Sequence, residues 1–386
     1  MKKTLTALVL TVGALLGVGI VVLASASTLQ ALKHYNDPYG FFIRQSFWLV
    51  GSLVVLFLCS RFDYHLWKKY LLFPSAFYVL IVLLLVLTLC PGIRKEINGS
   101  YRWLPLIGSF RIQPGEFAKL AIVVVFAVWM DHIGWRVKQF GRGVVVPGVL
   151  LGVFALLMYL EKDLGATMVV GVLGISLMFI AGIRLLYLLP FATVALSLGT
   201  WWVMRDPHRL GRIKAWWAFV VDPTSAATTN HQLYQSIVAF MSGGPYGVGF
   251  NQSLQKYWYL PEAHTDFIFA IGGEELGFAF SGGVLVAYAV LLTCGMLISI
   301  HAPDRLGRLL AFGMTLLLVF QAAFNIGVVT GCLPTKGLAL PFISYGGTNL
   351  LTALFAVGTL FNVGMHIGVQ DEQMHIPVVR DAVSTV

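Results

Sequence analysis

The stretch Pro261–Gly277 reads PEAHTDFIFAIGGEELG, and an apolar run that continues to residue 300 follows it. The stretch carries a histidine and four acidic residues: His264, Glu262, Asp266, Glu274 and Glu275. Carboxylates are costly in lipid, so acidic groups beside a long apolar run indicate a functional site. Phe-Ile-Phe-Ala comes directly after Asp266, which predicts that Asp266 lies where an aqueous loop meets the membrane. A group at that level can reach a substrate that is part lipid and part polar.

The whole chain has the composition of an integral membrane protein. Of its 386 residues, 58% are hydrophobic and 11% are charged, whereas soluble domains average about 25% charged residues. The sequence contains no P-loop, dinucleotide fingerprint or zinc motif, so we expect neither ATP-driven transport nor a nucleotide or organic cofactor. Nothing in it suggests a nucleic acid partner. The four cysteines lack CxxC spacing and are expected to be small buried thiols.

Ten apolar runs are long enough to cross a bilayer, which takes about 20 residues each. They are 5–29, 43–60, 70–90, 115–133, 144–160, 164–182, 185–204, 278–300, 309–331 and 346–368. The first run is longer than the ~7–15 residues of a signal-peptide core, so we interpret it as a membrane helix. An all-α, polytopic membrane protein is predicted, with one membrane domain over residues 1–370 and a short cytoplasmic tail over 371–386.

An even number of spans places both termini on one side of the membrane. We take that side as cytoplasmic, because the loops on it then contain few acidic residues and several basic ones, as the positive-inside rule expects. The basic residues are Arg61, Lys68, Lys69, Arg136, Lys138, Arg142, Arg184, Arg305 and Arg308. The opposite loops are also basic, which the rule does not predict.

A large outer loop is predicted between the seventh and eighth spans, over about residues 205–267. Loops of this length are usually functional. Residues 216–219 and 234–240 resemble interfacial amphipathic or re-entrant segments, and the glycine-rich run 243–249 breaks any helix there. Its basic residues, Arg205, Arg209, Arg212, Lys214 and Lys256, suit either the binding of a phosphate or pyrophosphate headgroup or ordinary anchoring at the interface.

Other charged residues have a structural and a functional interpretation. Glu116 and Lys119 share a helix face, so they either neutralise each other or line a polar cavity. Asp163 is either a solvated turn residue or a group that points into an outer cavity. Glu274 and Glu275 follow Asp266 by about two helical turns, and are expected to be buried against basic groups such as Lys119.

Asp266 is the preferred general base because nothing apolar separates it from the aqueous loop. His264 either orients Asp266 or simply lies at the interface. The last outer loop, over residues 331–347, contains Lys336 and Ser344 together with two prolines and several glycines. Such non-helical backbone at membrane depth is tolerated where it is buried in protein or lines a cavity, so we interpret this segment as a cavity wall.

Together these stretches resemble the SEDS family (shape, elongation, division and sporulation), membrane glycosyltransferases that include FtsW and RodA. The resemblance spans most of the chain and is carried by NGSYRW (98–103), QPGEFAKL (113–120), EKDLGAT (161–167), YLPEAHTDFIFA (259–270), GEELG (273–277) and FNIGVVTGCLPTKGLALPFISYGG (324–347). Within the family, Glu262-Ala263-His264 and Pro334-Thr335-Lys336-Gly337 favour the FtsW-like branch.

The resemblance implies polymerisation of lipid II into β-1,4 glycan strands outside the cytoplasmic membrane, for septal wall synthesis. It maps the family's essential aspartate onto Asp266, as the base that deprotonates the acceptor hydroxyl. Substrate-binding residues would be Arg102, Arg209, Arg212, Lys256, His264, Lys336 and Ser344, and cavity charges would be Glu116, Lys119, Asp163, Glu274 and Glu275. A divalent cation, Mg²⁺ or Mn²⁺, is an implied cofactor.

Implied partners are lipid II, a glycan strand on undecaprenyl pyrophosphate, a class B penicillin-binding protein and other division proteins. Three alternatives stay open on the sequence: a lipid II flippase, a RodA-like elongation polymerase and a non-catalytic scaffold. A flippase would depend on buried charges such as Glu116 and Lys119, whereas only chemistry requires a base at Asp266.

Overall fold

The computed structural model describes residues 1–92, 96, 99–106, 110–222 and 230–375. Over this part of the chain, nine helices are long and apolar enough to cross a membrane. They are built on α1 (Lys2–Ala26), α3 (Gly40–Arg61), α5 (Leu72–Leu89), α6 (Pro114–Ile133), α7 (Val146–Leu160), α9 (Leu185–Arg205), α14 (Ile268–His301), α15 (Arg305–Val329) and α16 (Gly347–His375). A shorter apolar helix, α8 (Leu164–Ile180), makes the tenth.

Short elements connect the long helices. They are α2 (Thr28–Tyr35), α4 (Leu66–Lys69), the 3₁₀ helix η1 (Gly134–Lys138), the π-helix η2 (Gly141–Val145), α10 (Pro207–Val221), α12 (His231–Gly243) and α13 (Gln255–Trp258). A two-stranded antiparallel ladder pairs β1 (Leu104–Pro105) with β2 (Arg111–Ile112).

The sequence prediction of an all-α polytopic membrane protein is confirmed, and each of the ten predicted spans falls on a helix. The largest difference concerns the eighth span, because α14 begins at Ile268 rather than at residue 278. The helix is interrupted at Gly277, whose φ of 70° and ψ of −159° suit glycine. A Cβ there would also overlap the backbone at Gly247. Both the dihedral angles and the lack of space therefore require glycine at this position.

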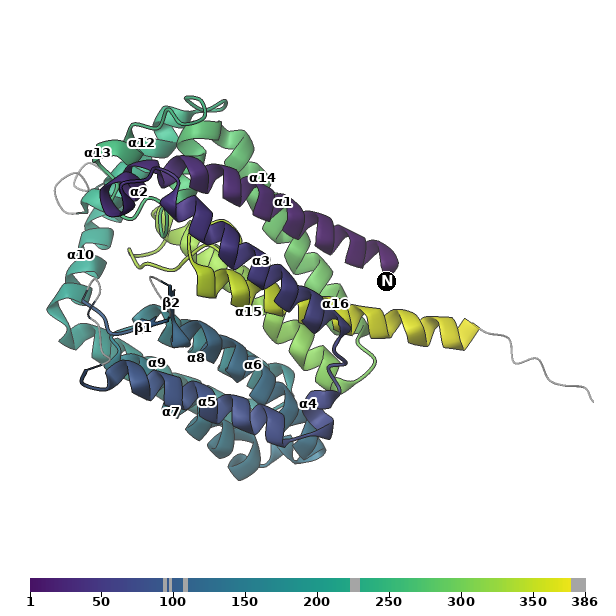
Figure 1. Ribbon diagram of the computed structural model, residues 1–386. Helices are drawn as coiled ribbons and strands as arrows, with labels where there is room; N and C mark the ends of the chain where they lie inside the picture. Colours follow the sequence, from purple (N-terminus) through teal and green to yellow (C-terminus); the bar gives the residue numbers. More distant parts are fainter. Residues whose placement is uncertain (93–95, 97–98, 107–109, 223–229, 376–386) are drawn as a thin grey trace, which may run out of the picture.

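The long helices run back and forth between two ends of the molecule (Figure 1). Helix α1 begins and α16 ends at one of these, which we call the terminal end. The opposite end, here the loop end, carries α2, α10, α12 and α13. The start of α1 and the described end of α16 therefore lie at the same end, as an even number of spans requires.

The core lies along α6 and α15, which pack against each other. Helix α6 is buried over most of its length because it also packs between α5 and α8, and α15 also contacts α8, α14 and α16. Helices α1, α3, α14 and α16 pack on one side of this core, and α5, α7, α8 and α9 on the other. Outer helices such as α9 expose apolar side chains, as a lipid-facing surface requires.

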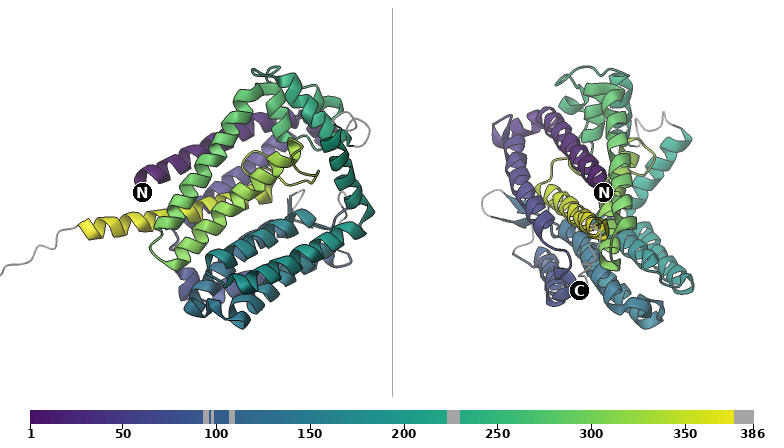
Figure 2. Two further views of the ribbon diagram at one scale, coloured as in Figure 1. Left: turned by 180° about the vertical axis from the view of Figure 1, so that it is seen from behind. Right: turned by 90° about the vertical axis from the view of Figure 1, so that its right-hand side faces the viewer.

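The long connection between α9 and α14 is folded. Residues 216–219 fall in α10 and residues 234–240 in α12, and α12 ends at Gly243, where the glycine-rich run begins. Helix α12 packs on α14. Helix α10 runs along the edge of the loop end in Figures 1 and 2, and the Trp216 indole N–H donates to the Gly331 carbonyl at 2.9 Å. Residues 223–229 of this connection lie outside the described residues.

The predicted tail over 371–386 starts inside a helix, because α16 continues to His375. The rest of that tail, residues 376–386, lies outside the described residues, as does Asn98 of the first family motif.

Candidate functional site

Asp266 lies at the loop end, in the turn just before α14, and is half-buried. A Cβ added at Gly337 would overlap the Asp266 carboxylate, so the 331–346 segment runs directly against that carboxylate. The Asn325 side-chain amide, from α15, donates to the backbone carbonyls of Asp266 (2.8 Å) and Leu338 (2.5 Å). One buried amide thus holds the base to the segment that covers it.

Lys336 lies beside Asp266 and over the start of α8. A Cβ added at Gly165 would lie 3.1 Å from the Lys336 Cε atom, which places the lysine stem against the first turn of that helix. Burial lowers the pKa of Lys336, the charge of Asp163 opposes that change, and the charge of Arg102 adds to it. A half-buried ammonium of this kind is well placed to meet an anionic substrate.

Asp163 caps the N-terminus of α8 and is buried. Its carboxylate accepts hydrogen bonds from the Ala166 N–H (3.1 Å) and the Gln113 side-chain amide (3.0 Å), and lies 3.8 Å from an Arg102 guanidinium nitrogen. Burial raises the pKa of Asp163, but the charges of Arg102 and Lys336 and the Ala166 N–H outweigh it, so the net pKa is lowered. Asp163 is therefore an ionised anchor within the site, not a solvated turn residue.

The environment of Asp266 shifts its pKa the other way, to about 6. Burial is the largest cause, and the Glu262 and Asp163 charges add to it, whereas Arg102 and Lys336 oppose it. A carboxylate with a pKa near 6 is ionised at neutral pH and still holds an abstracted proton better than an ordinary aspartate does. This is the electrostatic setting that a general base requires.

The arginines of α10 border the site. The Arg209 Nε lies 2.9 Å from an Asp206 carboxylate oxygen, and the guanidinium stacks 4.2 Å from the Trp202 ring centroid. Arg212 is exposed, and the charges of both arginines lower the pKa of Lys336. Arg205 lies 4.3 Å from the Trp201 ring centroid, as an interfacial anchor would. The basic cluster therefore splits into an anchoring part and a part that faces Lys336.

Lys256, which the sequence predicts to bind substrate, is used inside the protein in this structure. Its Nζ atom lies 2.7 Å from Glu275 Oε1, with both side chains 1% exposed. The same ammonium donates to Ser25 Oγ (2.6 Å) and Asn251 Oδ1 (2.7 Å). An ammonium has three N–H donors, so these three acceptors satisfy it completely.

The predicted pairing of the buried glutamates with basic groups is met for Glu275, although its partner is Lys256 and not Lys119. Glu275 forms a salt bridge with Lys256, and Glu274 accepts hydrogen bonds from the Ser253 hydroxyl and the Leu254 N–H. Lys119 instead pairs with Glu116 at 2.7 Å and donates to the Gln321 side-chain oxygen at 2.8 Å. The predicted salt bridge between Glu116 and Lys119 is therefore present, and both glutamates of α14 are buried as expected.

His264 and Ser344 also lie in packed positions and not in a substrate-binding surface. The His264 ring is 5% exposed and lies 4.6 Å from the Phe41 ring and 5.7 Å from the Tyr345 ring, centroid to centroid. The buried Ser344 hydroxyl donates to the Thr265 carbonyl at 2.6 Å and accepts from the Leu340 N–H at 2.8 Å. Both residues fix the 331–346 segment against the turn that carries Asp266.

Sequence reasoning missed several residues that build this site. Asn325 and Gly337 hold and crowd Asp266, and Gln113 contacts Asp163; all three stand within the motifs quoted above. Glu161 was also missed: it is buried and hydrogen-bonded to the Thr88 hydroxyl, and burial raises its pKa to about 8. Its position in the motif EKDLGAT was the available signal.

The residues around Asp266 provide few free ligand atoms for a resident metal ion. Within the described residues, the one group of three or more His, Cys, Asp or Glu side chains close enough to share an ion lies at the terminal end. At the loop end, both oxygens of Asp163 already accept hydrogen bonds. A Mg²⁺ or Mn²⁺ ion would therefore be held mainly by phosphate oxygens of the substrate and by water, a mode that Mg²⁺ commonly uses. The cation stays a prediction.

Fold and site together define a polytopic membrane enzyme. It holds a half-buried carboxylate, Asp266, beside half-buried cations at one end of its helices.

Comparison with known proteins gives the family. The model of the FtsW/RodA/SpoVE family, described as "Cell cycle protein", matches residues 6–368, and the chain belongs to this family. The probable peptidoglycan glycosyltransferase FtsW of Trichlorobacter lovleyi is 40% identical over 92% of both chains. Stage V sporulation protein E of Bacillus subtilis is 37% identical over 91% of this chain and 94% of its own.

Solved structures show the same fold. A chain from a structure titled "Structural coordination of polymerization and crosslinking by a peptidoglycan synthase complex" superposes with a TM-score of 0.73 at 28% identity, covering 93% of this chain and 97% of that one. The rod shape determining protein RodA of Thermus thermophilus gives 0.67 at 26% identity, over 93% and 95%.

Proposed function

We propose that this chain is a peptidoglycan glycosyltransferase of the FtsW type, which polymerises lipid II into β-1,4 glycan strands. Its relatives are named for this activity. The observation that carries the assignment is the setting of Asp266: a half-buried carboxylate, with its pKa raised to about 6, beside Lys336 and the Arg102–Asp163 pair.

The reaction is a single inverting displacement. Asp266 accepts the proton of the 4-hydroxyl of the incoming lipid II sugar, and that oxygen attacks the anomeric carbon of the glycan strand. The bond from that carbon to the pyrophosphate oxygen breaks as the new glycosidic bond forms. The departing undecaprenyl pyrophosphate takes the electron pair, and the abstracted proton stays on Asp266 until water removes it.

Charge stabilisation of the leaving group falls to Lys336, Arg102, Arg209 and Arg212. Lys336 and Arg102 are partly buried, and cations in a water-poor site stabilise a developing phosphate charge more strongly than solvated cations do. A divalent cation, if the substrate brings one, would add charge neutralisation on the pyrophosphate oxygens. Lys256 has no part in this step, since Glu275 occupies it.

We infer that the loop end faces outward and that both termini are cytoplasmic, in the cytoplasmic membrane and at the division septum. The basic residues at the terminal end support this orientation. A class B penicillin-binding protein is the proposed partner, together with other division proteins. Support comes from the structural relative, whose title joins polymerisation to crosslinking.

The test is polymerisation of labelled lipid II by the purified chain, alone and with the partner. We expect glycan strands from the parent and a loss of at least ~100-fold for Asp266→Asn, since general bases contribute ~10²–10⁴-fold. Asp222→Asn, an exposed carboxylate at the same end, is the matched control. Polymer formed equally well by Asp266→Asn would refute the mechanism, and lipid II movement across vesicles that is independent of Asp266 would favour a flippase.

A further inference from the structure

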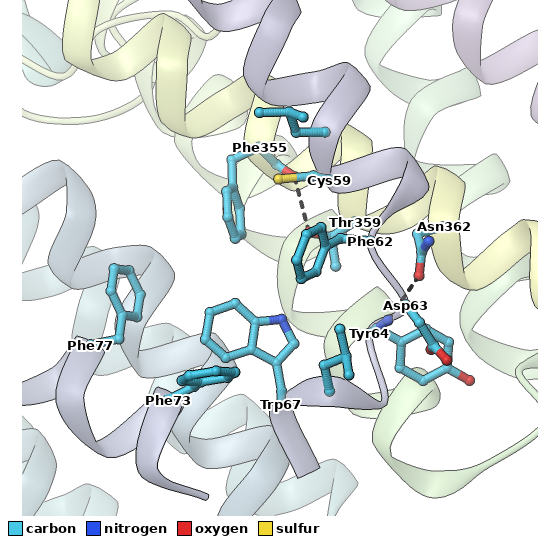
Figure 3. A pocket seen from close by; sticks show the side chains of 12 residues that line it. Cys59, Phe62, Asp63, Tyr64, Trp67, Phe73, Phe77, Phe355, Thr359 and Asn362 are labelled. Atoms are coloured by element: carbon cyan, nitrogen blue, oxygen red, sulfur yellow. Dashed lines mark hydrogen bonds between the residues drawn. The ribbon is translucent and has the colours of Figure 1, made fainter. Parts of the chain in front are cut away.

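A second group of ionisable side chains lies at the terminal end, far from Asp266, and the proposed reaction does not use it. Asp63 and His65 stand in the turn between α3 and α4, and His366 stands near the end of the described side chains of α16. Figure 3 shows Asp63 and Tyr64 beside a cavity of about 340 Å³ that is lined mostly by apolar and aromatic side chains.

The three side chains converge to the spacing of metal ligands. One ligand atom from each lies within 4.8 Å of the others. His366 Nε2 is 3.5 Å from Asp63 Oδ1, and His65 Nδ1 is 2.7 Å from the same oxygen. Two ligands at the ~2.0–2.2 Å bond lengths of a tetrahedral zinc ion lie about 3.3 Å apart. The His366–Asp63 pair already has about this spacing, and the His65 and Asp63 atoms need to move apart only slightly.

The His366 ring is fixed in the form that binds a metal. Its Nδ1 is 2.9 Å from the Asn362 carbonyl, which can only accept a hydrogen bond, so Nδ1 carries the proton. With Nδ1 carrying a proton, Nε2 is the ring nitrogen available to bind a metal, and it faces Asp63. Metal-binding histidines are usually oriented by such a bond from the second nitrogen to a carbonyl or carboxylate.

The turn that carries Asp63 and His65 is held against α16 before any ligand arrives. The Tyr64 N–H donates to Asn362 Oδ1 at 3.1 Å, as Figure 3 shows, and Asn362 Nδ2 donates to the Ser60 carbonyl at 3.0 Å. The Tyr64 hydroxyl donates to Asp304 Oδ1 at 2.6 Å. The ligands therefore need little ordering when they bind, which lowers the cost of binding.

We propose that Asp63, His65 and His366 form a binding site for a zinc ion. Two imidazoles and a carboxylate favour Zn²⁺ over Mg²⁺ or Ca²⁺, which prefer oxygen ligands. Water fills the fourth position. Asp304 Oδ2 lies 3.7 Å from His65 Nε2, the ring nitrogen that faces away from Asp63, and is placed to orient the His65 ring. By binding Asp63 and His65 in the α3–α4 turn and His366 on α16, the ion cross-links these segments and stabilises the terminal end of the bundle. This site is independent of the glycosyltransferase assignment.

The test measures metal binding by the full chain, purified in detergent with a tag that contains no histidine. After chelator treatment and dialysis against Zn²⁺, we expect one ion per chain by mass spectrometry, and a rise in Tm with Zn²⁺. In a competition titration, His366→Ala and Asp63→Asn should each weaken binding by at least ~100-fold, since changes to outer partners alone cost ~10–100-fold. His301→Ala is the matched control, because its Nδ1 also bonds a carbonyl four residues earlier (Leu297, 2.8 Å) but the residue lies outside the cluster.

Two outcomes would overturn the proposal: a parent chain that binds no zinc, or variants that bind it as tightly as the parent. Should a variant fail to fold, the parent alone decides the question. Co²⁺ substituted for zinc in a folded site of low coordination number gives visible absorption bands that Zn²⁺ displaces, and a parent without such bands has no site of this kind.

Discussion

Replacing Lys256 with methionine separates the structural role seen here from the substrate-binding role that the sequence predicts. The ammonium has three acceptors at 2.6–2.7 Å, and its charge lies 2.7 Å from Glu275 Oε1. With an effective dielectric constant of about 20, a pair at that distance is worth roughly 6 kcal/mol before desolvation is subtracted. Removing one partner of a buried pair costs about 3–5 kcal/mol, because the other charge is left uncompensated.

We therefore expect Lys256→Met to lower the Tm sharply, measured by thermal denaturation in detergent, and to reduce activity only in proportion to the folded fraction. The double variant Lys256→Met/Glu275→Leu should recover most of the stability, because it removes the stranded carboxylate as well. Lys214→Met, an exposed lysine of α10, is the control and should leave the Tm unchanged.

The opposite pattern would refute this reasoning. If Lys256→Met kept the parent Tm and raised the KM for lipid II, the lysine would be a substrate ligand and the buried pair would be dispensable. If the double variant were as unstable as the single one, the loss would come from packing and not from an uncompensated Glu275 charge.

Three further predictions concern the loop end. The polymerisation rate should be half-maximal near pH 6 and fall below it, because Asp266 has a pKa of about 6 and must be ionised to act; a pH profile flat from 5 to 8 would contradict this. Gly337→Ala should lower kcat with little loss of Tm, since its Cβ displaces the Asp266 carboxylate, whereas Gly346→Ala, with only an ordinary contact at 3.5 Å, should behave like the parent. Burial raises the pKa of Glu161 from 4.5 to about 8, so the folded chain binds the extra proton and stability falls as pH rises from about 4.5 to 8. Glu161→Gln should flatten that dependence in Tm measurements, and an unchanged slope would show that Glu161 is not protonated in the folded chain.

The membrane helices could be predicted from the sequence because hydropathy is a local property. Each apolar run must form a helix in lipid to satisfy its own backbone, whatever its neighbours are. Hydropathy alone predicts the start of this span at 278, ten residues later than the start of α14 at Ile268, since the charged Glu274 and Glu275 interrupt the apolar run. They are tolerated because Ser253 and Leu254 from the preceding connection donate hydrogen bonds to Glu274, and Lys256 neutralises the charge of Glu275.

The sequence does not predict which charged side chains pair with each other, because the pairs form between segments that are distant in the chain. Ser25 of α1 meets Lys256 across 231 positions of sequence, and no spacing rule predicts such a pair. Lys336 stands in the last outer loop and Lys256 in the short helix α13 at the same end, yet Lys336 approaches Asp266 and Lys256 is enclosed. Composition and charge pattern alone do not distinguish them.

The assignment of the base depends on a contrast between two carboxylates that share the same cations. Arg102 and Lys336 act on both Asp163 and Asp266, yet the pKa of Asp163 is lowered and that of Asp266 is raised. The difference is local: Asp163 accepts N–H groups from Ala166 and Gln113, which stabilise its charge, whereas the Asp266 carboxylate is pressed against the backbone at Gly337. Carboxylates whose environments push their pKa values apart divide the work of a site between them. Asp163 therefore stays charged and orders Arg102, and Asp266 is the carboxylate that exchanges a proton near neutral pH.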